Sequence, residues 1–172
     1  LADIGYDTNT MALMGYDWRL SFPMLQRRDR YLSKLKSQIE EMVAATGEKA
    51  LIVSHSMGAP LFLYFLQWVA TDPDPHTNTE GGGGGADWAE RHVHTFVNVA
   101  GPLLGLAPAF IRLLTGEIKE ISEAGYGLLG RLVDRSFSPY HRRQLMRTWG
   151  SVHQLLPKGG SAVWDAAADG VG

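Results

Sequence analysis

Residues 50–58 read Ala-Leu-Ile-Val-Ser-His-Ser-Met-Gly, and this stretch decides the fold of the chain. Apolar residues lead into a small-x-Ser-x-small pattern, and a mainly apolar segment, 59–70, follows directly. A strand, a sharp turn and a helix in this order are typical of a nucleophile elbow, here with Ser56 at its tip. Ser54 and Gly58 suit such a turn, because larger side chains there would collide with the backbone. The pattern predicts a positive φ angle at Ser56.

Met57, the residue after the predicted nucleophile, supplies a second candidate group. Its backbone N–H lies at the start of the predicted helix, where it is expected to form half of an oxyanion hole. His55 directly precedes Ser56 and resembles a general base in position. Adjacent residues on a sharp turn point in different directions, so we interpret His55 as a packing residue beside the site.

The segments around the turn alternate between helical and extended patterns. Apolar residues recur at helical spacing over Gln26–Thr46, and Gly47 is placed to cap that helix. Ala50–Ser54 and Val93–Val99 are predicted strands, and Met57–Ala70 is a predicted helix. This alternation indicates an α/β fold, in which helices cover the faces of a parallel sheet.

The other segments have less regular patterns. A short strand is predicted within Thr10–Leu20, ending at Asp17 and Trp18. The glycines at Gly81–Gly85 predict a mobile surface loop that acts as a spacer. Apolar residues and glycines over 107–146 predict short amphipathic helices, which form either a lid that contacts lipid or an ordinary packed cap.

Composition argues against several classes of protein. The 172 residues are 45% hydrophobic and 20% charged, which is ordinary for a globular domain. The net charge of −2 and the lack of a long basic run give no reason to expect a nucleic-acid partner. Without cysteine the chain has neither disulfides nor thiolate metal ligands. No stretch reaches the roughly 20 apolar residues that span a bilayer, and the first residues do not show a signal-peptide pattern.

Several polar residues are weaker candidates for catalysis or metal binding. Asp134 followed by His141 or His153 has the chain order of a serine, acid and base triad, but these residues lie in or just after the predicted insertion. We expect the true acid and base to lie outside this chain. His92 and His94 would share a strand face. No third ligand accompanies them, so a half-exposed face is favoured over a metal site.

Charged residues near the amino end allow two interpretations each. Asp17 and Arg19, one residue apart, either border a substrate pocket together with Trp18 or lock the end of a strand. The run Arg27-Arg28-Asp29-Arg30 is interpreted as a solvated helix start, with a contact to lipid phosphate as the alternative.

Four ordered segments resemble one family. They are Tyr16-Asp17-Trp18-Arg19-Leu20-Ser21, Val53-Ser54-His55-Ser56-Met57-Gly58, the glycine run with Ala86-Asp87-Trp88, and Gly101-Pro102-Leu103-Leu104-Gly105. Together they resemble the phospholipid:diacylglycerol acyltransferases, in the lecithin:cholesterol acyltransferase-like branch of the α/β-hydrolases. The resemblance extends from about Tyr16 to Trp164.

The resemblance implies an α/β-hydrolase-like fold, present here in its central part. A sheet core over about 10–105 would carry the elbow, and a lid- or cap-like insertion would follow over about 106–146. Members of this fold carry further strands and the second oxyanion donor before such a segment, and the triad acid and base after it. The chain is therefore expected to be an internal fragment that is inactive by itself.

The resemblance also implies a reaction. A fatty acyl group would pass from a phospholipid to diacylglycerol through an acyl-enzyme on Ser56, without a cofactor. Asp17 and Trp18 would border the acyl pocket, and the enzyme would work at a membrane surface of the endoplasmic reticulum. If water resolved the acyl-enzyme, the protein would be a phospholipase A or lipase. A non-catalytic lipid-binding protein is the third interpretation.

Overall fold

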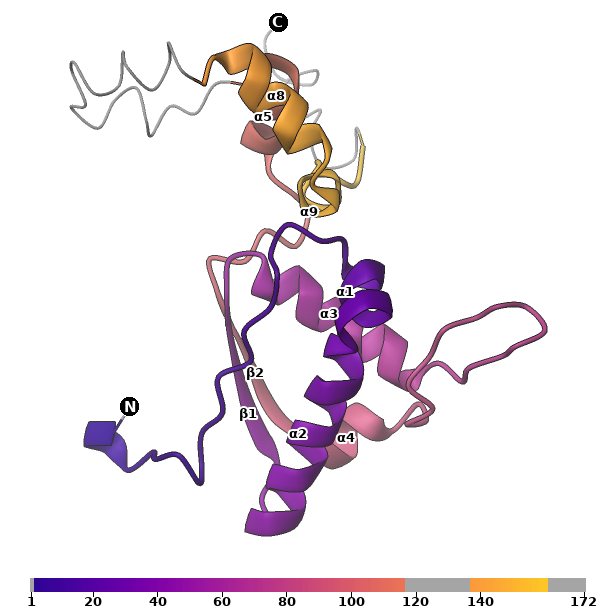
Figure 1. Ribbon diagram of the computed structural model, residues 1–172. Helices are drawn as coiled ribbons and strands as arrows, with labels where there is room; N and C mark the ends of the chain where they lie inside the picture. Colours follow the sequence, from indigo (N-terminus) through magenta and orange to yellow (C-terminus); the bar gives the residue numbers. More distant parts are fainter. Residues whose placement is uncertain (1, 117–136, 161–172) are drawn as a thin grey trace, which may run out of the picture. The chain divides into compact units, whose positions relative to one another are not determined.

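The computed structural model describes residues 2–116 and 137–160, which fall into two units (Figure 1). The first unit comprises residues 1–17 and 22–101, and the second comprises residues 18–21 and 102–172. The first unit begins with a short 3-10 helix, η1 (Ala2–Ile4), and contains the strands and the turn at Ser56.

The centre of the first unit is a β–α–β arrangement. Strand β1 (Ala50–His55) is followed by helix α3 (Gly58–Ala70), a connecting loop, helix α4 (Trp88–His92) and strand β2 (Val93–Val99). The two strands pair in parallel. The alternation of patterns therefore predicted the parallel pairing correctly, and β1 runs one residue further than predicted.

The helix predicted over Gln26–Thr46 is two helices, α1 (Phe22–Asp29) and α2 (Tyr31–Thr46). Arg30 separates them, because its backbone adopts a left-handed conformation with a φ angle of 55°. The side-chain oxygen of Gln26 accepts a hydrogen bond of 3.1 Å from a backbone N–H in the first turn of α2. Gln26 thus replaces the missing N-cap side chain and stabilises the break.

The rest of α2 follows the sequence prediction. Gly47 ends the helix with a φ angle of 72°, and its N–H donates to the Val43 carbonyl oxygen over 2.9 Å. This left-handed cap is the one predicted. The buried side chains Leu32, Leu35 and Ile39 recur every three or four residues, which confirms the helical periodicity.

The two faces of the sheet differ in what covers them. Helices α2, α3 and α4 lie on one side of the strands (Figure 1), and the ring of Phe62 in α3 lies 4.9 Å from that of Phe96 in β2. On the other face, four apolar side chains are between 38% and 61% exposed: Leu51, Val53, Val97 and Val99. The described residues therefore leave one apolar face of this sheet open.

The glycine run Gly81–Gly85 is not the free spacer that composition predicts. The N–H groups of Gly82, Gly83 and Gly84 donate to the last carbonyl oxygens of α3 and to that of Thr71, over 2.7 to 3.0 Å. Helix ends need such donors, because their last carbonyls have no helical partner. A Cβ on Gly84 would lie 2.6 Å from Cδ1 of Trp88, so only glycine allows this close approach.

The strand predicted within Thr10–Leu20 is not formed. Residues 11–17 are an irregular loop that side chains hold against the helices. The Tyr31 hydroxyl in α2 donates to the Met14 carbonyl oxygen over 3.2 Å, and the rings of Tyr16 and Tyr31 lie 5.3 Å apart. The apolar and aromatic residues that suggested a strand thus serve side-chain packing instead of backbone pairing.

The described part of the second unit is helical, with α5 (Ala107–Thr115), α8 (Pro139–Arg147) and α9 (Gly150–Gln154). Arg142, buried in α8, donates from Nε to the carbonyl oxygen of Gly116 over 3.0 Å and so ties α8 to the end of α5. The helices agree with the helical pattern over 107–146, but residues 117–136 lie outside the described part. Of the helices that the structure describes, none combines the length and the apolar character needed to cross a bilayer.

Candidate active site

Ser56 lies at the tip of the turn between β1 and α3. Its φ angle is 51°, in a region that residues other than glycine seldom adopt. Its backbone N–H donates to the Val99 carbonyl oxygen at the end of β2 over 3.0 Å, and its own carbonyl oxygen accepts the Ala59 N–H over 3.1 Å. Such a conformation costs about 1–3 kcal/mol and clusters at functional sites. The predicted positive φ angle is confirmed.

Packing explains the small residues on either side of Ser56. A Cβ on Gly58 would lie 3.3 Å from the Cβ of Ser54 and 4.0 Å from the hydroxyl of Tyr16. The Ser54 hydroxyl is itself buried, with no hydrogen-bond partner among the described residues. Space is therefore limiting two residues before and two residues after Ser56, as the small-x-Ser-x-small pattern predicts.

Met57 is the N-cap residue of α3 and is only 8% exposed. No described residue accepts a hydrogen bond from its backbone N–H. The start of a helix favours negative charge, because its unpaired N–H groups carry a partial positive charge. A substrate oxygen that becomes negative during attack by Ser56 would therefore find a donor in Met57.

The end of β2 carries a second strained residue. Ala100 has a φ angle of 52°. The side-chain Oδ1 of Asn98 accepts the Gly101 N–H over 2.7 Å and closes the turn around Ala100. A Cβ on Gly101 would overlap both Asn98 and the Cβ of Ala59 in α3. Asn98 is not among the residues predicted from the sequence, although its place just before a Gly-Pro turn at a strand end is a usable signal.

The two adjacent residues predicted to border a substrate pocket contact different partners, and the pocket itself stays a prediction. Asp17 belongs to the first unit and forms an ion pair with Arg28, whose Nη2 lies 3.0 Å from its carboxylate. Trp18 belongs to the second unit, where its ring packs edge-on against Trp149 at 4.9 Å. The strand end that Asp17 was expected to lock is absent, so its charge instead holds the loop before α1.

The charged run at residues 27–30 covers the last turn of α1 and the N-cap of α2, Arg30, so the predicted helix start is correct only for its last residue. Nε of Arg27 lies 2.7 Å from the Glu80 carboxylate. Hydrogen bonds to Asp29 and Asp17 raise the pKa of the Arg28 guanidinium, and the bond from Arg28 lowers the pKa of Asp29. The Arg27–Glu80 and Arg28–Asp29 pairs are solvent-accessible, as predicted, so each of these two ion pairs contributes little to stability.

The histidines closest in sequence to the strands occupy separate environments. His55 is exposed, with Leu51 and Val53, on the open face of the sheet, so the packing predicted for it is not seen among the described residues. His92 ends α4 instead of lying on the strand, and its Nδ1 is 2.9 Å from the Trp88 carbonyl oxygen. In the part of the chain that the structure describes, no three His, Asp or Glu side chains gather as a metal site would require.

Two of the three residues considered as triad partners, His141 and His153, belong to the second unit. Asp134 lies outside the described residues. Nδ1 of His141 is 3.1 Å from the Ser138 hydroxyl, and Nδ1 of His153 is 3.1 Å from the Trp149 carbonyl oxygen. Each ring is engaged within its own helix or at its cap, whereas Ser56 belongs to the first unit.

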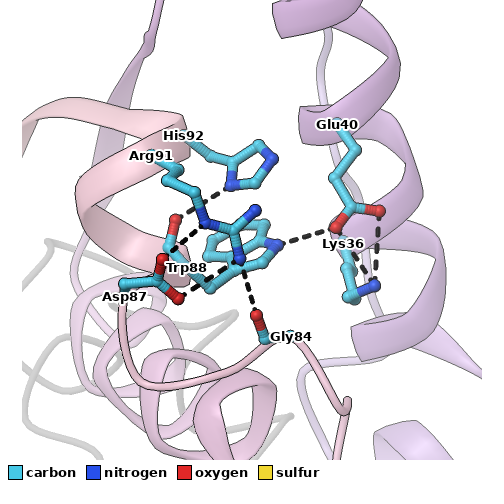
Figure 2. A network of polar contacts seen from close by, with 7 residues as sticks. All are labelled: Lys36, Glu40, Gly84, Asp87, Trp88, Arg91 and His92. Atoms are coloured by element: carbon cyan, nitrogen blue, oxygen red, sulfur yellow. Dashed lines mark hydrogen bonds and ion pairs between the residues drawn. The ribbon is translucent and has the colours of Figure 1, made fainter.

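A polar network around Trp88 fixes α4, and with it the start of β2 (Figure 2). The Trp88 indole N–H donates to the Glu40 carboxylate over 2.7 Å, and Lys36 lies 3.0 Å from the same carboxylate. Burial opposes ionisation of Glu40, but the hydrogen bonds from Trp88 and Lys36 outweigh it, so the pKa of Glu40 is lowered. Arg91 adds bonds to Asp87 and to the glycine run.

Comparison of the sequence with known proteins identifies its family. The family model described as lecithin:cholesterol acyltransferase matches residues 1–169. The chain is 39% identical to the phospholipid:diacylglycerol acyltransferase of Saccharomyces cerevisiae and 42% identical to phospholipid:diacylglycerol acyltransferase 1 of Arabidopsis thaliana. Each alignment covers 95% of this chain and 24% of the relative.

A more distant relative has a double name. The lysosomal phospholipase A and acyltransferase of Mus musculus is 30% identical over 142 residues, which are 83% of this chain and 27% of the relative. The chain spans about a quarter of the length of the curated relatives it matches. The family model covers nearly all of the sequence, and the strand, strained serine and helix have the order that the resemblance implied. This chain belongs to the lecithin:cholesterol acyltransferase family.

Proposed function

We propose that Ser56 is the nucleophile of an acyltransferase that moves a fatty acyl group from a phospholipid to diacylglycerol. The observation that carries the proposal is the strained turn, which places Ser56 at the amino end of α3 beside the Met57 N–H, a donor that has no acceptor among the described residues. The names of the yeast and plant relatives supply the donor and the acceptor. The reaction would need neither acyl-CoA nor another cofactor, because the phospholipid is itself an activated ester.

The reaction would proceed in two steps on Ser56. First, Oγ attacks the ester carbonyl carbon while a general base takes the hydroxyl proton, and the Met57 N–H stabilises the oxyanion. The ester C–O bond then breaks, and the base returns the proton to the departing lysophospholipid oxygen. Second, the diacylglycerol hydroxyl attacks the acyl-enzyme and its proton passes through the base to Oγ. Triacylglycerol leaves, and Ser56 is restored.

The base, the acid that orients it and the second oxyanion donor are proposed to come from parts of the protein other than this chain. The family resemblance supports this assignment, because the hydrolase fold carries the acid and base after further strands of the sheet. Without these groups, the 172-residue chain alone is expected to show only the residual catalysis that substrate binding and one oxyanion donor provide.

Hydrolysis is the second candidate function. The mouse relative is named both a phospholipase A and an acyltransferase, and the two reactions differ only in what resolves the acyl-enzyme. Water in place of diacylglycerol would release a free fatty acid. A site that excludes water favours transfer, so the outcome depends on how the acyl-enzyme is covered.

Contact with a membrane surface is proposed for the second unit. In α5 the apolar side chains of Phe110, Ile111 and Leu114 are 51%, 54% and 50% exposed. Their spacing puts them along one side of the helix, where they could enter a lipid interface. The alternative is an ordinary cap in which another element covers this side. The endoplasmic reticulum is the proposed location on the strength of the family resemblance alone.

The test uses the full natural polypeptide that carries this sequence. It is supplied with phosphatidylcholine labelled in its acyl chain and with unlabelled diacylglycerol in mixed vesicles. Label in triacylglycerol indicates transfer, and label in free fatty acid indicates hydrolysis. The Ser56→Ala variant is expected to lose both products, whereas Thr95→Ala, an exposed change in the neighbouring strand, should retain them. Activity that survives Ser56→Ala would overturn the proposal.

A further inference from the structure

We propose that Asn98 positions Ser56 for nucleophilic attack, a role that rests on the proposed function of Ser56. Asn98 lies in β2 opposite Ser54 of β1, one residue before Val99, which stands opposite His55. It thus lies at the carboxyl ends of two neighbouring parallel strands. Such strand ends are where open parallel sheets place their reacting groups.

The Asn98 side chain closes a strained turn. Its Oδ1 accepts the Gly101 N–H over 2.7 Å, and its Nδ2 lies 3.4 Å from the Gly101 carbonyl oxygen. The turn forces Ala100 to a φ angle of 52°, which alanine avoids unless other contacts impose it. The shorter of the two Asn98 contacts is well within hydrogen-bond range and supplies that constraint.

The closed turn reaches Ser56 through its neighbours on both sides. Val99 lies inside the turn, and its carbonyl oxygen accepts the Ser56 N–H over 3.0 Å. Gly101, the partner of Asn98, packs against Ala59, whose N–H donates to the Ser56 carbonyl oxygen over 3.1 Å. One backbone hydrogen bond of the strained serine therefore ends on a residue inside the Asn98 turn, and the other ends on a residue of α3 that packs against this turn.

Because the Asn98 side chain is exposed, a positioning role can be distinguished from a role in the stability of the fold. The side chain is exposed and fills no part of the core, so its removal creates no cavity. Its loss would instead free the turn to relax and shift the Val99 carbonyl. A displacement of about 1 Å at a reacting group can cost roughly 100-fold in rate. The predicted effect is therefore on reactivity and less on folding.

The test measures the second-order rate at which a fluorophosphonate ester labels Ser56 in the full natural polypeptide. Asn98→Ala removes the acceptor, and Asn98→Thr is a second variant that suits a strand but carries a shorter polar group. Both should be labelled about 10- to 100-fold more slowly, with kcat for acyl transfer reduced and KM for phospholipid unchanged. Asn98→Asp keeps an acceptor oxygen for Gly101 and should restore much of the rate. Thr95→Ala, exposed on the same strand, is the control.

Each outcome decides the matter. Slow labelling of a variant that melts near the temperature of the unsubstituted protein, with rescue by Asn98→Asp, would support the proposal. A folded Asn98→Ala or Asn98→Thr variant that is labelled at the unsubstituted rate would overturn it. The proposal would also be overturned if the labelling rate fell only in those variants whose melting temperature also fell, and if Asn98→Asp did not restore the rate. If the unsubstituted protein is not labelled at Ser56, the proposed function fails first, so the two failures are distinguishable.

Discussion

The indole N–H of Trp88 donates a hydrogen bond of 2.7 Å to the carboxylate of Glu40, and so joins α4 to α2 (Figure 2). Trp88 is only 1% exposed, and its ring lies 5.3 Å from that of Phe65 in α3. Because β2 begins directly after α4, this contact sets where β2 starts. The Val99 carbonyl that holds Ser56 lies at the other end of the same strand.

Trp88→Phe is expected to destabilise the protein by roughly 1–3 kcal/mol, because it removes a buried hydrogen bond and part of a core side chain. Denaturant unfolding measures the change. Trp18→Phe is a matched control, because Trp18 is 52% exposed and a phenyl ring can keep its edge-on contact. Equal losses for the two variants would contradict the role assigned to Trp88.

The contribution of Glu40 should depend on pH in one direction. Its pKa is lowered on folding, so the stabilisation is fully present above the ordinary glutamate value of 4.5. It is lost as the pH falls through the lower pKa of the folded state. Glu40→Gln should therefore be less stable than the unsubstituted protein at neutral pH, with a gap that narrows in acid. The control is Glu41→Gln, a change at an exposed neighbour. A difference in unfolding free energy between Glu40→Gln and the unsubstituted protein that does not change with pH would contradict this account, as would the same pH dependence in Glu41→Gln.

The glycine run should not tolerate side chains at its packed positions. A Cβ on Gly82 would lie 2.8 Å from Cα of Val69, and one on Gly84 would lie 2.6 Å from Trp88. Gly82→Ala and Gly84→Ala are each expected to cost roughly 1–3 kcal/mol, the usual range for overpacking. Gly15→Ala is the control, because nothing lies within 4 Å of its added Cβ. Equal melting temperatures for all three variants would contradict this packing and would show that the glycine run is a spacer.

Local patterns in the sequence were enough to predict the turn and both strands. The limits on side-chain size around Ser56 are set by the turn itself, so Ser54 and Gly58 reveal it without knowledge of the rest of the fold. The φ angle of Gly47 was predictable for the same reason, since it follows from the helix that it ends.

Features that depend on contacts between distant residues could not be predicted in this way. The break at Arg30 depends on a left-handed residue with no glycine to mark it. Composition made the glycine run look free, because only the fold shows that Trp68 and Trp88 pack against it. The turn that Asn98 closes could not be predicted either, because nothing about an alanine indicates that the backbone at Ala100 has a positive φ angle.

The exposed side of α5 should contribute to membrane binding. Replacement of both Phe110 and Leu114 by serine is expected to weaken liposome binding by about tenfold or more, because the apolar area that enters the interface is lost. Co-sedimentation of the full natural polypeptide with phosphatidylcholine vesicles measures the effect. Leu13→Ser is the control, because Leu13 is 97% exposed in the first unit. Unchanged sedimentation of the double variant would favour an ordinary packed cap.

The identity of the residue that carries the acyl group tests the central claim most directly. The full natural polypeptide is mixed with a fluorophosphonate ester, or quenched in acid during turnover of labelled phosphatidylcholine, and the modified peptide is identified by mass spectrometry. We predict that both the phosphonyl and the acyl adduct lie on Ser56, and that Ser56→Ala abolishes both. An adduct on another residue, or acyl transfer that continues without Ser56, would contradict the account.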